Sequence, residues 1–277
     1  MKILRSPTAA LSFSVALSLA SISSALAEEM TPTGGKQPSD WAYKIGAGVI
    51  VGPTYEGSKH YQAGPLPVAE ISWRNAVSLS VTEGAKVVIR PLTDKGFSVS
   101  GGIGYWQGRK EGVDKDNGDA LRGLGTLSGN AVGKLGVEYQ YKAITAGLNL
   151  ARDIGGDRDG TTITVKGGYK IYQGQAFKVR TELSTTWADD NYMKGLFGIT
   201  PEQARKSLKH YSVYDAQAGM KDVKIGVNAS YDITSSVNLF AFAEAGRLLS
   251  DAADSPIVKN QGAENQFTTA LGLVYHF

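Results

Sequence analysis

The residues that could support acid–base or metal chemistry are few in this sequence. It contains three histidines, His60, His210 and His276, and no cysteine. No two histidines stand at a metal-ligand spacing, and no H-E-x-x-H pattern is present, so we predict no transition-metal site. The lack of cysteine excludes disulfides, thiol catalysis and cysteine-type zinc sites. We therefore expect neither a metal nor another cofactor.

Two clusters could still support hydrolysis. His210 lies near Ser207 and Ser212, as a serine lipase or protease would require, and Asp189 and Asp190 could act as paired carboxylates. A Ser–His pair needs an orienting third group, which is not evident. Adjacent residues at a strand end point to opposite faces of the sheet. We interpret both clusters as solvated loop residues and predict that the protein is not an enzyme.

Three other patterns resemble ligand-binding motifs only in part. The Asp-rich segments 114–119 and 156–160 lack the distant glutamate of an EF-hand loop, and turn formation explains their composition. The glycine-rich segment 101–104 is not followed by the helix that a dinucleotide site needs. With 29 basic and 26 acidic residues, the formal charge is only +3, so we expect no nucleic-acid partner.

The N-terminus has the composition of a secretory signal peptide. Lys2 and Arg5 precede a mostly apolar stretch, and the small residues Ala25 and Ala27 stand directly before Glu28. We therefore predict a signal peptide over residues 1–27 and a single β-domain over residues 28–277. The apolar stretch is too short to span a bilayer, and no later run is long enough to do so as a helix. A membrane location would therefore require a β-barrel.

The rest of the chain alternates apolar and polar residues in long runs. In 97–105 and 134–141, for example, every second residue is mostly apolar or aromatic. Runs of about 10 to 12 residues match tilted transmembrane strands. We predict an all-β, antiparallel transmembrane barrel with twelve strands near residues 42–52, 65–74, 76–82, 85–91, 96–107, 131–141, 143–152, 161–171, 176–187, 223–232, 236–248 and 266–277.

The strand count leaves two alternatives. Segments 76–82 and 85–91 are short and could form one bulged strand, which would give about ten strands. Segment 211–220 could be a further strand. With twelve strands, the short links fall on one side of the membrane and the long segments 53–64, 108–130, 188–222 and 249–265 fall on the other. Outer-membrane barrels have short periplasmic turns and long external loops.

Aromatic residues and one helical motif refine this picture. Aromatic residues at run ends are expected to form girdles at the two membrane interfaces: Trp41, Tyr43, Trp73, Tyr105, Trp106, Tyr139, Tyr141, Tyr169, Tyr172, Trp187, Tyr231 and Tyr275. Within the longest loop, Thr200 and Pro201 have the pattern of a helix start. We predict one short helix there, continuing to His210.

Cations outnumber anions on the predicted inward face. The cations are Lys44, Lys134, Lys166, Lys170, Lys178, Arg180 and Lys224, and the anions are Glu138, Glu182 and Asp232. A cationic lining would favour small anions in an open pore. Pairing of these charges with one another, or with an inserted loop, would instead plug the barrel. A barrel of twelve strands is compatible with both arrangements.

The chain ends on an aromatic residue. Leu273, Tyr275 and Phe277 lie on one face of the last predicted strand. This ending resembles the C-terminal signal that the barrel assembly machinery reads in bacterial outer-membrane proteins. The resemblance implies that this machinery inserts the chain.

A series of motifs also resembles the MipA/OmpV family over nearly the whole chain after the predicted signal peptide. The matching positions are Pro53, Tyr55, Gly57, Ser58, Tyr61, Pro65-Leu66-Pro67, Gly108-Arg109, Gly123-Leu124-Gly125, Trp187, Asp190, Tyr192, Met193, Phe197-Gly198-Ile199-Thr200, Gln203-Ala204, the segments 219–223 and 247–258 with Asp254-Ser255-Pro256, Tyr275 and Phe277.

This resemblance implies a place in the Gram-negative outer membrane, in contact with its lipid. For the best-known relative it implies a scaffold that joins a lytic transglycosylase to a peptidoglycan synthase, and it supplies no catalytic residues. We therefore predict a scaffold. The alternatives are a small-solute channel with a cationic lumen and a surface adhesin or ligand-binding barrel. The candidate loop or partner surface consists of the family-motif residues Tyr55, Gly57, Ser58, Tyr61, Asp190, Tyr192, Met193, Phe197, Gly198, Asp254, Ser255 and Pro256.

Overall fold

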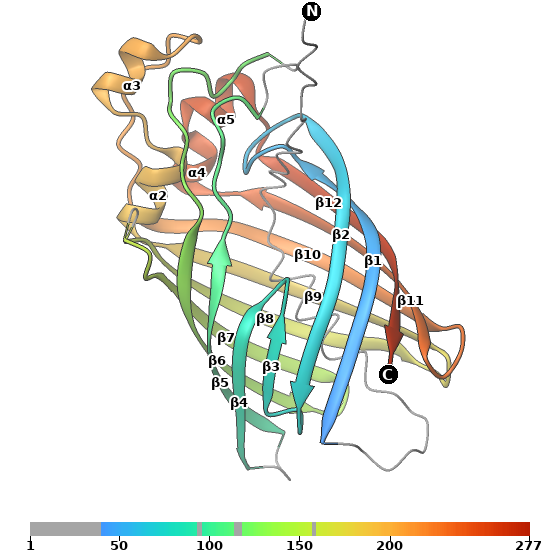
Figure 1. The fold of residues 1–277 in the computed structure, drawn as a ribbon. Helices are drawn as coiled ribbons and strands as arrows, with labels where there is room; N and C mark the ends of the chain where they lie inside the picture. The colour runs from blue at the N-terminus through green and yellow to red at the C-terminus, as the bar shows by residue number, and fades with distance from the viewer. Residues whose placement is uncertain (1–39, 93–95, 114–117, 157–158) are drawn as a thin grey trace, which may run out of the picture.

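The computed structural model describes residues 40–277 apart from 93–95, 114–117 and 157–158. The predicted cleavage residues Ala25, Ala27 and Glu28 lie outside this part of the chain. Figure 1 shows the fold as a barrel of long, tilted strands with short helices gathered at one end.

Twelve antiparallel strands form a closed barrel. Each strand pairs with its neighbours in sequence, and β1 pairs with β12 from Lys44–His276 to Val51–Thr269. The strands are β1 (Trp41–Pro53), β2 (Tyr61–Trp73), β3 (Val77–Ser80), β4 (Gly84–Leu92), β5 (Phe97–Trp106), β6 (Asn130–Tyr141), β7 (Ile144–Asp153), β8 (Thr161–Gln173), β9 (Phe177–Ala188), β10 (Gly219–Asp232), β11 (Val237–Leu248) and β12 (Asn265–His276). This arrangement confirms the predicted fold class and strand count.

The ten-strand alternative is wrong because β3 and β4 are separate strands. β3 pairs with β2 through Trp73–Val77 and with β4 through Val77–Val87. Arg74 and Asn75, in the turn before β3, have φ values of +50° and +51°, which tighten the chain reversal. The alternative of a further strand at 211–220 is also not formed. Only its last two residues belong to β10, and Tyr214 makes an isolated bridge with Ile199.

The two faces of the sheet differ as the alternating pattern predicts. Large apolar side chains on the outer face are exposed, and several are more than half exposed, including Ile45, Leu79, Leu135, Leu183 and Leu271. A continuous apolar outer surface on a closed barrel is the surface that faces lipid. None of the helices in the described residues is long and apolar enough to cross a membrane.

Most of the predicted girdle aromatics lie on this outer face, but Trp106 does not. Tyr105 is exposed, whereas the ring of Trp106 packs in a T-shaped arrangement against Tyr192, with centroids 5.0 Å apart. Tyr105 and Trp106 are consecutive residues of β5, and consecutive strand residues point to opposite faces of the sheet. Trp106 therefore belongs to the interior of the barrel.

The inner face is apolar on one side of the barrel. A buried cluster formed by β1, β2, β11 and β12 comprises Ile50, Leu66, Val68, Phe240, Phe242, Ala270 and Val274. The wall is tightly packed where β12 meets β11. A Cβ atom added to Gly272 would lie 2.6 Å from Cζ of Phe240 and 2.8 Å from the carbonyl oxygen of Ala47. Gly272 therefore lets the Phe240 ring lie across β12 beside the closing seam.

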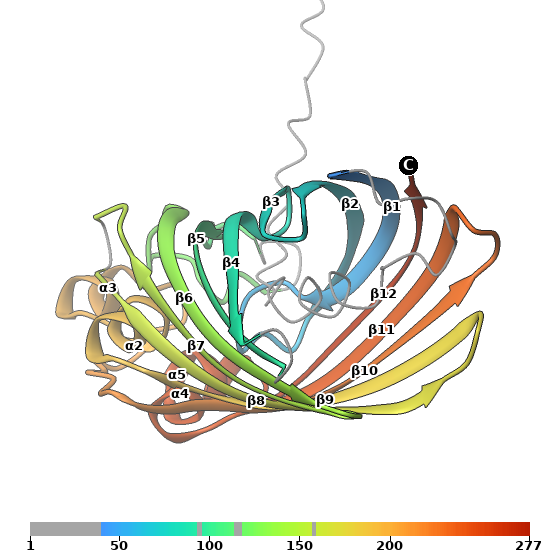
Figure 2. The same cartoon turned by 90° about the horizontal axis from the view of Figure 1, so that it is seen from below.

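The described residues include four short helices at the long-loop end, which lie beside one another in both views (Figures 1 and 2). They are α2 (Asp190–Phe197), α3 (Pro201–Lys206), α4 (Ser250–Asp254) and α5 (Pro256–Gln261). The predicted helix start at Thr200 is confirmed, with a capping box between Thr200 and Gln203. This helix ends at Lys206 rather than His210, because Ser207 has extended backbone angles. The other three helices were not predicted.

Candidate functional site

The long loops and short helices pack into one layer at the long-loop end of the barrel, which we call the cap. Its segments are 53–60, 189–218, 249–264 and the described part of 108–130. Two buried apolar clusters hold it together. The first contains Ala188, Met193, Phe197, Ala216, Leu248, Ala252, Ala253 and Val258. The second contains Tyr55, Ala120, Leu121, Leu124, Ile199, Tyr211 and Ile257. Because each cluster contains residues from several loops, the cap has a small hydrophobic core of its own.

Several of the family-motif residues lie in the interior of this core. Tyr55, Met193, Phe197 and Ser255 are almost fully buried. The Oγ atom of Ser255 donates a hydrogen bond to the carbonyl oxygen of Phe197 at 2.7 Å, which joins the 249–264 segment to the end of α2. Pro256 begins α5 and is also buried.

The loop 53–60 is seated against the same segment. Gly57 has φ +91°, and a Cβ atom there would lie 2.6 Å from Cγ2 of Val258. The backbone nitrogen of Ala263 donates to the carbonyl oxygen of Gly57 at 2.9 Å. Ser58 accepts a hydrogen bond from Oγ1 of Thr54 at 2.8 Å. These contacts join a loop near the start of the barrel to a loop near its end.

The remaining motif residues are more exposed, and several have local structural roles. Asp189, which precedes the motif residue Asp190, caps α2 by accepting from the backbone nitrogen of the motif residue Tyr192 at 2.9 Å. Asp190 accepts from the backbone nitrogen of Ala218 at 2.5 Å. Asp254 pairs with Lys259 at 2.8 Å. Of the candidate partner surface, Tyr61, Asp190 and Asp254 are therefore the side chains exposed to solvent, and Gly198 forms the C-cap of α2.

A buried ionic group connects the cap to the barrel wall. The ammonium of Lys221 on β10 lies 2.7 Å from Oδ2 of Asp222 and also pairs with Glu56 in the 53–60 loop. Its Nζ atom is 5.6 Å from the ring centroid of Tyr192. Lys221 is 5% exposed and Asp222 is 1% exposed. Because a buried charge without a partner is costly, this group fixes the position of the 53–60 loop.

Tyr214 adds a hydrogen bond between cap segments. Its hydroxyl donates to the carbonyl oxygen of Asp251 at 3.1 Å. Burial, followed by the negative charges of Asp251 and Asp254, raises the pKa of Tyr214 to about 12. The phenol therefore stays protonated and keeps its donor role throughout the physiological range.

Many of the inward-facing charges pair with one another, both between strands and along one strand. Lys166 is 3.1 Å from Glu138 and 3.9 Å from Glu182. The other pairs are Lys44–Glu70 at 3.2 Å, Lys178–Asp232 at 3.7 Å, Arg180–Glu182 at 3.8 Å and Lys224–Glu244 at 3.6 Å. The cationic face predicted from the sequence is thus largely neutralised by carboxylates. Glu70 and Glu244 were not part of that prediction.

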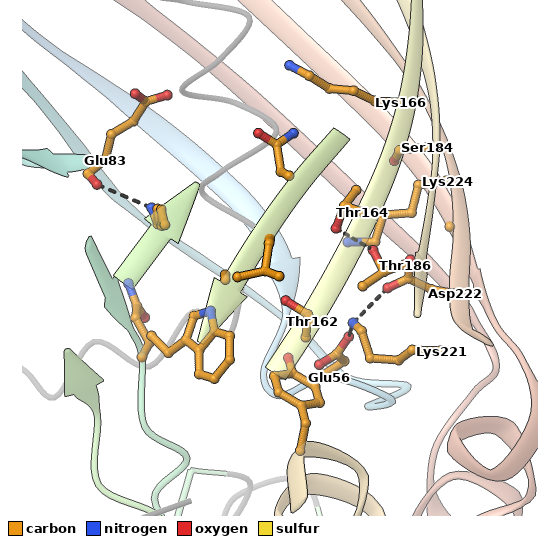
Figure 3. Close-up of a pocket in the computed structure, with 18 of the residues that line it drawn as sticks. Glu56, Glu83, Thr162, Thr164, Lys166, Ser184, Thr186, Lys221, Asp222 and Lys224 are labelled. Carbon is orange, nitrogen blue, oxygen red and sulfur yellow. Dashed lines mark hydrogen bonds and ion pairs between the residues drawn. The ribbon is translucent and has the colours of Figure 1, made fainter. Parts of the chain in front are cut away.

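A cavity of about 350 Å³ lies between the cap and the inner wall (Figure 3). Lys221, Asp222 and Lys224 line it from β10, and a row of hydroxyl side chains lines it from β8 and β9: Thr162, Thr164, Ser184 and Thr186. Trp106 and Tyr192 contribute aromatic rings. On another part of the wall, Nζ of Lys134 donates to the carbonyl oxygen of Glu83 at 3.2 Å. The cavity therefore combines charge, hydroxyl groups and an aromatic pair.

The clusters considered for catalysis have structural contacts in the cap. The backbone nitrogen of Lys209 donates to Oγ of Ser207, and that of His210 donates to the carbonyl oxygen of Ser207, both at 3.2 Å. These bonds form a turn. No group of three or more His, Cys, Asp or Glu residues that could hold a metal ion occurs within the described ranges. Both Asp-rich segments fall partly outside those ranges.

Several of these residues were not predicted from the sequence. Glu56 was passed over because its partner Lys221 is 165 residues away, and Trp106 was assigned to the outer face. Glu244 could have been found, because it has the same strand parity as the buried residues Phe240 and Phe242 on β11.

The side chains of the C-terminal strand point to the predicted faces of the sheet. Leu273, Tyr275 and Phe277 are all exposed on the outer side of β12. The ring centroids of Tyr275 and Phe277 are 4.8 Å apart, and the backbone nitrogen of Phe277 donates to the carbonyl oxygen of Tyr43 at 3.1 Å. The last residue thus completes the ladder with β1. Recognition of this ending by the assembly machinery stays a prediction.

Comparisons with solved structures return bacterial outer-membrane proteins at low sequence identity. OmpT of Vibrio cholerae is 9% identical, with a TM-score of 0.35 over 88% of this chain and 99% of that one. OmpF of Salmonella typhi, solved with daunomycin, is 10% identical, with a TM-score of 0.36 over 85% and 97%. A structure described as a bacterial polysaccharide outer membrane secretin is 9% identical, with a TM-score of 0.43 over 87% and 100%. No curated protein sequence matches the chain.

A family model gives a direct assignment. The model described as MltA-interacting protein MipA matches residues 45–277, which run from the fifth residue of β1 to the C-terminal phenylalanine. The match includes every strand of the closed barrel and all segments of the cap. The chain is an outer-membrane β-barrel, and it belongs to the MipA family.

Proposed function

We propose that this protein is an outer-membrane scaffold that binds a peptidoglycan-processing enzyme, a lytic transglycosylase of the MltA kind, and holds it near a peptidoglycan synthase. The observation that carries the proposal is the family match, whose description names an interaction with MltA. The geometry is compatible with an anchor, because the cap is a packed core and many lumen charges are paired with one another. The His, Ser and Asp groups of the long loops form caps and turns, so we propose binding rather than catalysis.

The short-turn end is the expected docking face. Peptidoglycan lies in the periplasm, and short turns face the periplasm in outer-membrane barrels. Two exposed cations hold fixed positions there. Arg74 forms paired hydrogen bonds with Asp40, both at 2.9 Å, and these bonds lower the pKa of the Asp40 carboxyl. Arg90 donates to the carbonyl oxygen of Asn75 at 2.8 Å. Together they give this end an ordered polar rim.

A binding measurement between purified proteins tests the proposal. The full chain in detergent is titrated with a purified MltA-type lytic transglycosylase, and saturable binding is expected. The double variant Arg74→Ala, Arg90→Ala should bind about fivefold more weakly, the scale of losing exposed interface charges. The matched control, Lys194→Ala with Lys259→Ala, removes two exposed cations from the cap and should bind like the wild type. The proposal would be refuted if the wild type did not bind the enzyme. It would also be refuted if only the cap control variant lost affinity.

A small-solute channel is the second candidate, and the cavity is the observation that favours it. A space of about 350 Å³ lined by charged and hydroxyl side chains could form part of a polar path through the barrel. Planar-bilayer recordings of the purified protein distinguish the two functions. Discrete conductance steps support the channel, and a silent bilayer containing folded protein excludes it.

A further inference from the structure

Lys134 differs from the other lysines that line the cavity. Lys86, Lys166, Lys221 and Lys224 each have a carboxylate within ion-pair distance. Lys134 donates to a neutral backbone carbonyl, that of Glu83, and no carboxylate of the described residues lies within ion-pair distance of its Nζ atom. The side chain is partly buried on the inner face of β6. A partly desolvated ammonium with a neutral partner favours an incoming anion.

The neighbouring strand leaves space for this ammonium. Lys134 pairs with Gly102 of β5. Its side chain extends across Gly104, where an added Cβ atom would lie 2.5 Å from both Cε and Nζ. Trp106 is the next inward residue on β5, about 7 Å farther along the strand. The ammonium and an aromatic ring therefore line the same part of the cavity.

Hydroxyl groups line another wall. Oγ1 atoms of Thr164 and Thr186 are 3.1 Å apart, and Ser184 lies on the same strand as Thr186. Figure 3 shows these three residues with Thr162 on the strands that border the cavity. Hydroxyl groups can both donate and accept, so they suit a ligand that itself carries several hydroxyls. The nearby charged groups Asp222, Lys221 and Glu56 already pair with one another.

We propose that this cavity binds a small hydroxylated carboxylate, the chemistry of a sugar acid. Lys134 binds the carboxylate, the Thr164, Ser184 and Thr186 hydroxyls bind ring hydroxyls, and Trp106 with Tyr192 contacts the apolar face of the ring. A volume of about 350 Å³ is at the small end of ligand sites, which suits one or two sugar units. The site lies inside the barrel, so it goes beyond the proposed scaffold function and does not depend on it.

Calorimetric titration of the full chain in detergent tests the proposal with glucuronate as probe. Glucose, which lacks the carboxylate, and acetate, which lacks the ring, are the comparison ligands. Glucuronate should bind about tenfold more tightly than glucose, the scale of one charge-assisted hydrogen bond. It should also bind more tightly than acetate, which lacks the hydroxyl and ring contacts. Lys134→Gln should weaken glucuronate binding about tenfold and leave glucose binding unchanged, and Lys134→Arg should restore it. Trp106→Phe should weaken the binding of both glucuronate and glucose.

Lys170→Gln is the matched control, because Lys170 is an inward-facing lysine of β8 outside the cavity lining. It should bind glucuronate like the wild type. Circular dichroism in the same detergent verifies that each variant is folded. The proposal is overturned if folded wild-type protein does not bind glucuronate, or if Lys134→Gln binds it unchanged. It is also overturned if acetate binds as tightly as glucuronate, which would show a bare anion site.

Discussion

The ammonium of Lys221 lies between Asp222, on its own strand, and Glu56, in the first cap loop. All three side chains are mostly removed from solvent. Removing one member of such a group leaves the others charged and without their counter-ion, which costs more than the group contributes when intact. The contacts of Lys221 therefore determine whether the loop stays seated on the barrel.

We predict that Lys221→Met lowers the free energy of unfolding by about 3 kcal/mol. Lys259→Met is the control, because it breaks the solvent-exposed pair with Asp254 and should cost less than about 1 kcal/mol. Urea unfolding in detergent, followed by tryptophan fluorescence, measures both. Equal losses in the two variants would contradict the role given to Lys221.

The 53–60 loop shows how one element depends on another that is distant in sequence. Gly57 combines a positive φ with close packing on Val258 of α5. Gly156 has a similar φ of +94°, but a Cβ atom there would meet open space. Comparing substitutions at the two glycines therefore separates the cost of backbone strain from the cost of displacing a packed side chain.

We predict that Gly156→Ala costs about 1 kcal/mol from left-handed strain alone. Gly57→Ala should cost about 1 to 3 kcal/mol more, because the added methyl group also forces Val258 away. Limited proteolysis should cut the cap of the Gly57 variant faster than that of the Gly156 variant. If both variants are cut at the same rate, the loop is not held by this contact.

The elements also show what a sequence reveals and what it does not. All twelve strands could be predicted because period-two alternation is local, and α3 could be predicted because Thr200 and Pro201 mark its start. The helices α4 and α5 have no side-chain cap, so they lack that signal. Asp189 does cap α2, but its carboxylate was interpreted as a solvated loop residue. The pairing of Glu56 with Lys221 is set by the closed barrel and has no local pattern.

At the scale of the whole molecule, closure depends on the fit between β12 and its neighbours. Gly272 lies opposite Gly48 of β1 and beside the ring of Phe240 of β11. A side chain at this position would displace the ring or separate the strands. Gly167 of β8 is the contrasting case, because a Cβ atom there meets no atom within 4 Å.

We predict that Gly272→Val lowers the fraction of chains that fold into closed barrels, at a cost of about 3 kcal/mol from overpacking. Gly167→Val should fold like the wild type, because its added side chain enters open space. The folded fraction is measured from the compact, fast-migrating form in electrophoresis without heating. An unchanged folded fraction for Gly272→Val would show that the seam tolerates a larger residue.

The joining of the 53–60 loop to the 249–264 segment bears on how the chain matures. Ser58 bridges Gly262, and Gln266 donates to the carbonyl oxygen of Ser58 at 3.1 Å, although more than 200 residues separate them. The 249–264 segment connects β11 to β12, the last two strands of the chain. An insertion intermediate that still lacks its last hairpin therefore has no partner for its first long loop. The 53–60 loop should therefore become resistant to added protease only when the barrel is complete, so its resistance reports the completion of a newly made barrel.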